Sequence, residues 1–312
     1  MRDWDLGFDL DKLQAFYAVT QLGGVGPAAR ALGRSQPAIS HRLRALADGL
    51  GVPLFERVGR QLRPTPAGAA LALQCAELFS LARNLPAAIR ADDVIRGRVS
   101  IGTYATIASH VLAPLLDPLL AAHPELSLRF VFELAPPLLE RLRRGDLDLV
   151  LIASSLRSTD GLDVHALTRD RMVAVAKPGF LPPRTPRLAA LRAKRYLAWE
   201  GNDESYAKVR AWAEANALIG DTTLVVPHLE SLRRLALRGV GWAVLPRYTA
   251  ADDLAAGLLV DLAPKGLDVT LDFHLVTRAR SLPTAAVRAV RAVLEGARPG
   301  SIRARHGTPS PG

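Results

Sequence analysis

The pattern of apolar and polar positions over residues 10–46 predicts three short helices. The first has apolar residues at the i, i+3, i+4 spacing of one helical face and stops at Gly23-Gly24. The second is a tight helix of small residues that ends at Gly33. The third begins at Ser35 as its N-cap, with Pro37 in its first turn, where the missing N–H costs nothing. Two helices joined by a short turn that contains Gly form the helix-turn-helix arrangement.

The third helix has an apolar stripe at Ile39, Leu43 and Leu46 and short polar or basic side chains on its other side. Such side chains hydrogen-bond base edges or phosphates. The residues that we expect to meet DNA from this helix are Ser35, Gln36, Pro37, Ser40, His41 and Arg44. Because ordinary solvated helices carry the same residue types, this pattern alone leaves DNA contact and plain solvent exposure both open.

Two short extended segments, residues 52–57 and 61–63, follow the three helices. They predict a small hairpin, or wing, with Arg57 and Arg60 near its tip. There the two guanidinium groups are in reach of a DNA backbone or minor groove. The wing favours DNA contact over the solvated alternative.

A longer helix is predicted after the wing, capped by Thr65 and ended or kinked by Pro86. Its apolar residues are spaced 4, 3, 4 and 3 apart, as in the a/d seam of a coiled coil, at Leu71, Cys75, Leu78, Ala82 and Leu85. The seam predicts a homodimer in which Cys75 approaches its partner. The alternative is packing of this helix against the chain's own second domain.

From Arg98 onward strands alternate with helices, which is typical of a parallel α/β sheet. The expected elements of the first unit are a strand at 99–101, a helix at 107–120, a strand at 126–132, a helix at 138–143 and a buried strand at 147–152. The second unit, from about 162 to 268, has expected strands near 172–176, 196–199, 222–226 and 242–245 and helices near 205–217 and 229–238. A strand at 269–277 and a helix at 284–296 then return to the first unit.

Composition and charge narrow the function classes. The 312 residues are 49% hydrophobic, which excludes a disordered chain, and they carry a net charge of +10. The charge is concentrated in residues 26–64 and 278–312, each with seven Arg. Two basic ends indicate a polyanionic partner, although an Arg-rich solvated surface is the alternative. No apolar run is expected to reach the ~18 residues of a membrane span, and no signal peptide is recognised. We therefore expect a cytoplasmic protein without a membrane partner.

Motifs for cofactors, metals and catalysis are not recognised. Cys75 is the single cysteine, so neither a disulfide within the chain nor a Cys-based zinc site is expected. Gly239-Val240-Gly241 starts like a dinucleotide fingerprint but lacks the third Gly and precedes a predicted strand. Asp146 and Asp148 are spaced as a candidate carboxylate pair, but we interpret them as structural. The sequence predicts no metal, no cofactor and no enzyme.

Residues 10–68 resemble the N-terminal domain of the LysR-type transcriptional regulators. The matching blocks, in the family's order, are Leu13-Gln14-Ala15-Phe16, Ala28-Ala29-Arg30-Ala31-Leu32, Ser35-Gln36-Pro37-Ala38-Ile39-Ser40, Leu54-Phe55-Glu56-Arg57, Gly59-Arg60 and Thr65-Pro66-Ala67-Gly68. Gly239 to Pro246 match the family's Gly-x-Gly-x-Ala-x-Leu-Pro turn. Arg34 and Val25 depart from the family pattern, in which an apolar turn residue and an aromatic residue are usual.

The resemblance covers about residues 10 to 297 and implies three functional parts and a tail. They are a winged helix-turn-helix DNA-binding domain at 1–64, a linker and dimerisation helix at 65–91, an α/β effector-binding domain at 92–297 and a disordered tail at 298–312. The effector-binding domain is expected to have two lobes of the periplasmic-binding-protein type, with lobe one at about 97–161 and 269–297 and lobe two at about 162–268. The implied partners are double-stranded DNA with dyad symmetry, a small-molecule effector and a second copy, with dimers of dimers as the larger assembly.

Ligands of α/β lobes bind beyond the carboxyl ends of strands. This rule and the family's effector-contacting loops select Thr103, Tyr104, Thr106, Ser154, Ser155, Trp199, Glu200, His228 and Glu230. Helix N-termini near Thr106 and Glu230 favour an anionic ligand. Glu200, Asp203, Glu204 and Glu230 favour a cation or amine if they face inward, and the sequence leaves this conflict open. A small-molecule-binding protein without a DNA function and an enzyme that uses the α/β lobes are the alternative functions.

Overall fold

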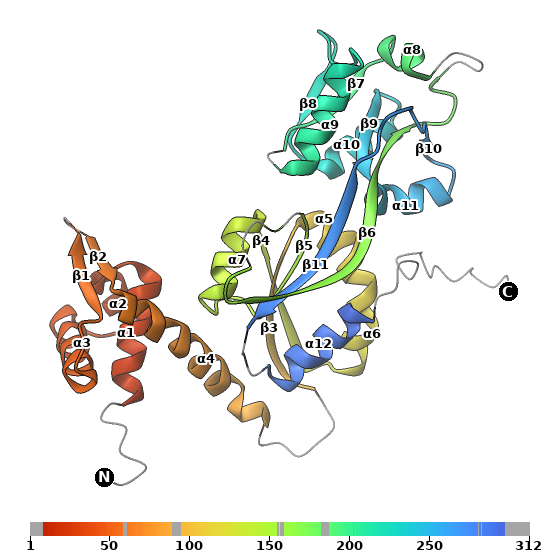
Figure 1. Cartoon of the computed structure of the whole chain (residues 1–312). Helices are drawn as coiled ribbons and strands as arrows, with labels where there is room; N and C mark the ends of the chain where they lie inside the picture. The colour runs from red at the N-terminus through yellow and green to blue at the C-terminus, as the bar shows by residue number, and fades with distance from the viewer. Residues whose placement is uncertain are drawn as a thin grey trace.

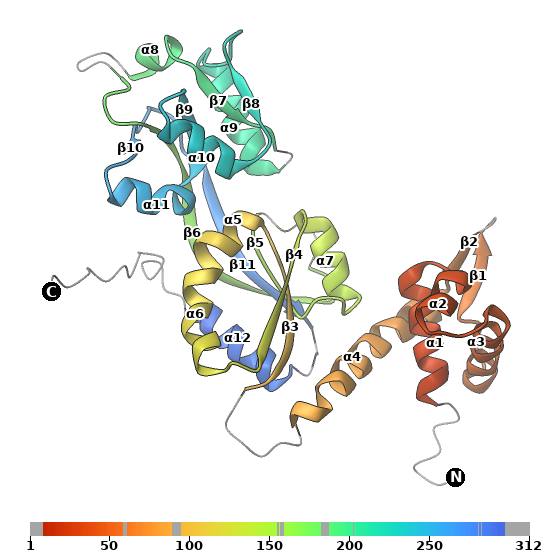
Figure 2. The ribbon, with the colours of Figure 1, turned by 180° about the vertical axis from the view of Figure 1, so that it is seen from behind.

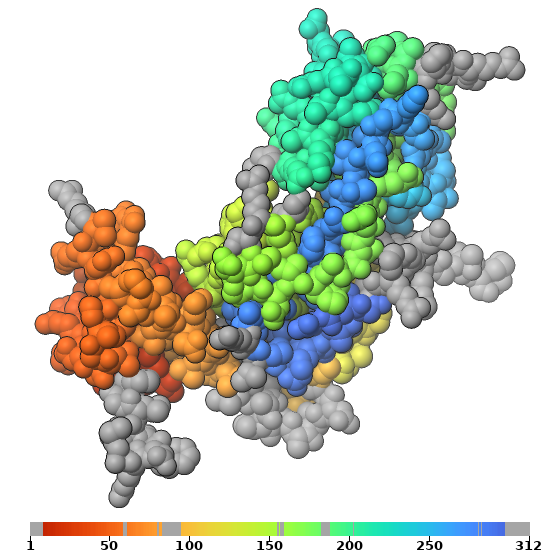
Figure 3. All heavy atoms as spheres, in the orientation of Figure 1, coloured from red at the N-terminus to blue at the C-terminus, as the bar shows by residue number. Residues whose placement is uncertain are grey.

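A computed structural model describes residues 9–58, 61–88, 95–154, 156, 159–181, 187–201, 203–279, 281 and 283–296. They form a helical head, a long helix α4 and two α/β lobes, which we call lobe one and lobe two (Figure 1). The space-filling view shows the head against lobe one, with lobe two on the far side of a narrow waist (Figure 3).

The head has the three predicted helices and the predicted wing. Its elements are α1 (Leu10–Leu22), α2 (Val25–Ala31), α3 (Gln36–Leu50), β1 (Phe55–Val58) and β2 (Gln61–Pro64), the last two paired antiparallel. Ser35 is confirmed as the N-cap of α3, since its hydroxyl accepts a hydrogen bond from the Ala38 N–H at 3.3 Å. Val25 packs on the buried cluster around Ile39, and the exposed Arg34 donates its N–H to the Ala29 carbonyl. The two departures from the family pattern therefore leave the turn intact.

Helix α4 (Pro66–Ala88) begins as predicted, with the Thr65 hydroxyl accepting a hydrogen bond from the Gly68 N–H at 3.0 Å. It continues two residues beyond Pro86. The residues of the predicted seam differ in burial. Cys75 is 1% exposed and packs with Phe16 and other residues of the head, so the expectation that it approaches a partner chain is wrong. Leu78, three positions further along, is 38% exposed.

Lobe one is built on the parallel strands that the alternation predicts. Strand β3 (Gly97–Thr103) pairs in parallel with β4 (Leu126–Phe132) on one side and with β5 (Leu149–Ala153) on the other. Helix α7 (Ala135–Arg143) connects β4 to β5. Helix α12 (Ala285–Glu295) packs on α6 and β3, which confirms that the chain returns to this lobe.

Residues 105–122 form one helical stretch of α5 (Ala105–Ile107), a π-helical turn η1 (Ala108–Leu112) and α6 (Ala113–Ala122). By length and hydropathy this stretch is the one candidate membrane span in the part of the chain that the structure describes. The expectation that no apolar stretch reaches the length of a membrane span is therefore wrong as far as length and composition are concerned. Ile107, Leu112 and Leu116 are nevertheless fully buried in the apolar core that β3 and β5 also supply. The stretch is a packed helix of lobe one.

Lobe two contains four more strands of the same sheet, with β10 paired to β6 at its side. Its elements are α8 (Arg187–Arg192), β7 (Tyr196–Trp199), α9 (Glu204–Ala215), β8 (Leu224–Val226), α10 (Leu229–Leu237), β9 (Trp242–Pro246), α11 (Arg247–Ala255) and β10 (Val260–Asp261). The sequence did not predict α8, α11 or β10. The other helices and strands lie close to their expected places.

Two long strands join the lobes. Strand β6 (Leu162–Ala176) and strand β11 (Thr270–Arg278) run antiparallel through the waist, and the sheet order is β4-β3-β5-β11-β6-β9-β7-β8 (Figure 1). The sequence predicts only residues 172–176 of β6. Its first half is a ribbon with mostly exposed residues, so it lacks the apolar alternation of a strand with one buried face.

The head contacts lobe one directly. The Tyr17 hydroxyl donates a hydrogen bond to the Arg144 carbonyl oxygen at 2.9 Å. Beside this bond Gly145 has a φ of +76°, and a Cβ atom there would lie 2.3 Å from the Ala76 Cβ of α4. Glycine is required at this position because both the backbone conformation and the close approach to α4 exclude a side chain.

Candidate functional site

A cavity of about 570 Å³ lies between the two lobes, beside the waist. Lobe one supplies the residues that follow β3 and β4, and lobe two supplies those that follow β7, β8 and β9. Met172 of β6 and Leu271 of β11 complete the wall. The cavity therefore lies beyond the carboxyl ends of parallel strands from both lobes, where ligands of α/β sheets bind. Its volume is in the range of small-molecule sites.

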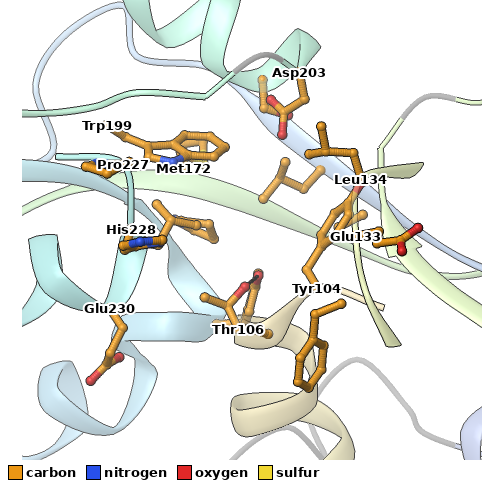
Figure 4. A pocket seen from close by; sticks show the side chains of 18 residues that line it. Tyr104, Thr106, Glu133, Leu134, Met172, Trp199, Asp203, Pro227, His228 and Glu230 are labelled. Carbon is orange, nitrogen blue, oxygen red and sulfur yellow. Dashed lines mark hydrogen bonds between the residues drawn. The ribbon is translucent and has the colours of Figure 1, made fainter. Parts of the chain in front are cut away.

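The structure brings five of the nine predicted ligand residues to this wall. They are Tyr104, Thr106, Trp199, His228 and Glu230 (Figure 4). Ser154 does not line the wall, but its side chain hydrogen-bonds Tyr104, which does. Ser155 lies outside the described residues.

Thr103 and Glu200 are not on the wall of the cavity, so the structure corrects these two predictions. Thr103 is fully buried, and its hydroxyl donates to the Leu151 carbonyl at 2.7 Å, which ties β3 to β5. It is the last residue of β3, and its alternate position on the strand turns the side chain away from the cavity. Glu200 is exposed to solvent.

Sequence reasoning missed most of the apolar wall. The missed residues are Ala105, Phe132, Leu134, Ala153, Met172, Pro227, Leu229, Pro246, Tyr248 and Leu271, together with the polar Glu133 and Ser205. Phe132 and Leu134 carried a usable signal, since Phe132 ends the alternating strand that was predicted at 126–132 and Leu134 comes two residues later. Tyr248 carried none, because it lies on the unpredicted helix α11 directly after the Leu245-Pro246 turn.

Two polar contacts join lobe one to lobe two at the cavity's edge. The Thr106 Oγ1 and Tyr248 Oη atoms lie 2.8 Å apart. The His110 Nε2 and Glu230 Oε2 atoms lie 3.5 Å apart. Burial raises the pKa of the Tyr248 hydroxyl, which therefore stays protonated and available as a donor or acceptor.

The cavity carries three carboxylates, and two of them are paired with arginines outside its wall. Glu133 lies 2.9 Å from the Arg141 guanidinium. The Arg233 guanidinium, 2.9 Å from Glu230, lowers the pKa of that carboxyl. The third, Asp203, accepts a hydrogen bond from the Tyr206 N–H at 2.8 Å as the N-cap of α9, and burial raises its pKa. Among the described residues, no Lys or Arg side chain lines the cavity.

A second candidate surface is the outer face of α3, on the side of the head that faces away from lobe one (Figures 1 and 2). Of the residues predicted to contact DNA there, Ser35, Gln36, Pro37, His41 and Arg44 are exposed and Ser40 is half-buried. Arg57 is exposed on β1, and Arg60 lies outside the described residues. Arg42 of α3 is turned to α1 instead, where it pairs with Asp11 at 2.7 Å.

The other motifs have structural roles. Asp148 accepts a hydrogen bond from the Ser100 N–H at 2.8 Å, in agreement with its structural interpretation. Gly239-Val240-Gly241 leads into strand β9, not into the helix that a dinucleotide site needs. No group of three or more His, Cys, Asp or Glu side chains that could hold a metal ion was found within the described part of the chain.

Comparison with known proteins gives matches over nearly the whole chain. Residues 10–69 match the family "Bacterial regulatory helix-turn-helix protein, lysR family", and residues 92–298 match "LysR substrate binding domain". The HTH-type transcriptional regulator BbuR of Bordetella bronchiseptica is 31% identical over 283 residues, 88% of this chain and 85% of that protein. AbaB of Streptomyces antibioticus, also an HTH-type transcriptional regulator, is 33% identical over 88% of this chain and 93% of its own length. The crystal structure of ArgP from Mycobacterium tuberculosis has a TM-score of 0.67 at 25% identity, over 93% of this chain and 99% of that one.

Proposed function

The chain belongs to the LysR family of transcriptional regulators, and from this membership we propose which of its residues perform the family's two binding functions. It is a DNA-binding regulator of transcription with an effector-binding domain. The proposed division follows the expected boundaries. Residues 1–64 bind DNA, residues 65–91 pair two copies, and residues 92–297 bind the effector.

DNA contact is assigned to the outer face of α3 and to the wing. Residues Ser35, Gln36, Pro37, Ser40, His41 and Arg44 enter the major groove, and Arg57 and Arg60 reach the adjacent backbone or minor groove. The observation that supports this assignment is the open exposure of the α3 face, which no described part of the lobes covers (Figure 2).

Assembly is assigned to the exposed face of α4. Leu78 and Leu81, three positions apart, are exposed on one side of α4, and Leu73 is exposed as well, while Cys75 is buried against the head. Large apolar side chains on one exposed helix face favour a second copy as the occupant. A two-fold dimer places two heads on a DNA site with dyad symmetry, and a dimer of dimers is the larger assembly of this proposal.

Effector binding is assigned to the cavity between the lobes, with Tyr104, Thr106, Trp199, His228 and Glu230 as contacts. The single observation that carries this proposal is that polar bridges between the lobes, such as that from Thr106 to Tyr248, lie on the cavity's own wall. A ligand in this cavity contacts the residues that form the bridges. It therefore changes the relative stability of two arrangements of the lobes, one with the bridges intact and one with the bridges broken. It can therefore couple to the DNA-binding heads through α4.

We assign the bound molecule the role of a signal and not of a substrate. We assign the cytoplasm as the compartment in which the chain meets chromosomal DNA.

The DNA-binding assignment is tested by a gel-shift titration with the DNA upstream of the chain's own gene. Arg44→Ala should weaken binding about tenfold or more, since it removes a base or phosphate contact. Arg238→Ala removes the same charge from an exposed position on lobe two and should bind as the wild type does. Equal binding by the two variants would contradict the α3 assignment.

A further inference from the structure

The three carboxylates on the cavity wall differ in where they point. Figure 4 shows the Glu133 and Glu230 carboxylates directed away from the centre of the cavity, and each is paired with an arginine outside the wall. The Asp203 carboxylate points into the space between Trp199 and Leu134. No ion pair involves Asp203 among the described residues.

The position of Asp203 follows from the local chain. Gly201 lies so close to the Trp199 ring that a Cβ atom there would be 2.7 Å from it, and only glycine allows this approach. The chain then starts α9, and Asp203 caps it beside the indole. The indole and the carboxylate therefore share one side of the cavity.

Among the described residues no cation pairs with Asp203, whereas the neighbouring Glu204 is itself paired with Lys208 at 2.7 Å. Glu204 is the charged neighbour that raises the pKa of Asp203, in addition to burial. Burial is the main cause that raises the pKa values of the Tyr104 and Tyr248 hydroxyls, and the Asp203 charge adds to both rises. A carboxylate held in an apolar cavity without a cation is costly, and a charged ligand of opposite sign offsets that cost.

An anionic ligand has less support in the same cavity. No arginine or lysine on the described wall is available for it, and α10 already has Glu230 in its first turn. Two other helices start at the wall without a side-chain cap: α7 has Pro136 and Pro137 in its first turn, which have no N–H, and the Tyr248 N–H of α11 already donates to Asp170. The last such start, α5, is three residues long and continues into a π-helical turn. It offers a weak anion site beside three carboxylates.

We propose that the effector is a small organic cation, an amine with an apolar or aromatic body, whose ammonium group pairs with Asp203 while its body packs on Trp199 and Met172. This proposal rests on the proposed effector role of the cavity and specifies its ligand class. The Trp199 ring adds a cation–π surface beside the carboxylate, and the apolar wall covers the body. About 570 Å³ accommodates a molecule of the size of an indolylethylamine.

The test uses three probes with one indole body on the full chain. Tryptamine carries an ammonium, indole-3-propionate a carboxylate, and tryptophol a neutral hydroxyl. Thermal shift and calorimetry should give the order tryptamine first, tryptophol weaker and indole-3-propionate weakest. Absence of tryptamine binding, or tighter binding of indole-3-propionate, would overturn the cation proposal. Tight binding of the carboxylate would still support a ligand role for the cavity, so the two proposals fail separately.

The matched variants are Asp203→Asn and Glu133→Gln. Asparagine is a good N-cap, so Asp203→Asn keeps the start of α9 while removing the charge. It should weaken tryptamine binding about 30-fold and leave tryptophol unchanged. Glu133→Gln removes a wall carboxylate that is already paired with Arg141 and should change tryptamine binding less than about threefold. Equal losses in the two variants would overturn the pairing with Asp203.

Discussion

The hydroxyl groups of Thr106 and Tyr248 lie 2.8 Å apart, although the two residues are 142 positions apart in the chain and belong to different lobes. The backbone N–H of Tyr248 also donates to the Asp170 carboxylate on β6 at 2.8 Å, and its ring packs edge-on against Phe273 of β11. The bridge is therefore anchored on both crossing strands. A ligand that contacts Thr106 or Tyr248 acts directly on the contact between the lobes.

Thr106→Val should loosen this bridge without changing the volume of the side chain. The Tyr248 hydroxyl loses its hydrogen-bond partner inside an apolar site, which costs roughly 1–3 kcal/mol. Differential scanning calorimetry should show a lower melting temperature. Ser109→Ala, which removes an exposed hydroxyl that bonds only within the same helical stretch, is the control and should change little.

The same variant also tests where the effector binds. Once a ligand is found by thermal shift, Thr106→Val and Trp199→Ala should each reduce the stabilisation that it gives. A ligand at about 100 times its dissociation constant stabilises by about 2.7 kcal/mol, so the loss is easily measured. A wild-type response in both variants would place the binding site outside this cavity.

Substitutions in the DNA-contacting surface should separate sequence preference from affinity. Gln36→Ala removes a side chain that can read base edges, so it should relax preference between DNA sites while changing overall affinity less. Arg57→Ala and Arg60→Ala should weaken binding to all sites alike and reduce the slope of log K against log salt by about one. Titrations of specific and unrelated DNA at several salt concentrations measure both effects. An unchanged slope in the arginine variants would contradict the wing assignment.

Leu78→Arg should dissociate the dimer while leaving the monomer folded. Leu78 is 38% exposed in the single chain, so the charge is tolerated there, but it becomes costly when a second copy covers it. Sedimentation velocity should show the monomer for this variant. Ala207→Arg, on the exposed side of α9, adds the same side chain elsewhere and should remain dimeric. An intact dimer for Leu78→Arg would move the interface away from this face.

The head could be predicted from sequence because its signals are local. Ser35, Pro37 and the glycines that end α1 and α3 act on neighbouring residues through caps and backbone conformation. Most strands of the lobes were found for the same reason, since each has its own apolar run. The first half of β6 was missed because a polar two-stranded ribbon is stabilised by its pairing with β11, which is more than 90 residues away in the chain.

The proposed dimer surface and the cavity could be predicted only in part, for the same reason: local signals do not show long-range contacts. A spacing of 4 and 3 marks Cys75 and Leu78 as apolar positions of one helix, but it does not tell that Cys75 meets Phe16 of the head while Leu78 faces outward. For the cavity, strand ends identified Tyr104 and Trp199. They did not identify Tyr248, which a turn and an unpredicted helix bring across from the other lobe. The sequence also left the sign of the ligand charge open, because only the fold shows which carboxylates already have arginine partners.

Cys75 provides a prediction about pH and thiol chemistry. Burial raises the pKa of its thiol to about 11, so the native chain should not react with iodoacetamide near neutral pH, whereas the unfolded chain should. The thiol of the unfolded chain ionises near pH 9, but the native thiol keeps its proton until about pH 11. Between these values the native state binds more protons, so this group's contribution to the free energy of unfolding falls by about 1.4 kcal/mol per pH unit. Below about pH 9 the contribution is complete and independent of pH.

Urea titrations of the wild type and of Cys75→Ala from pH 8 to 11 measure how the free energy of unfolding changes with pH. The variant lacks the thiol, so its free energy of unfolding should decline less steeply. Parallel declines in the two proteins would contradict a buried thiol at this position.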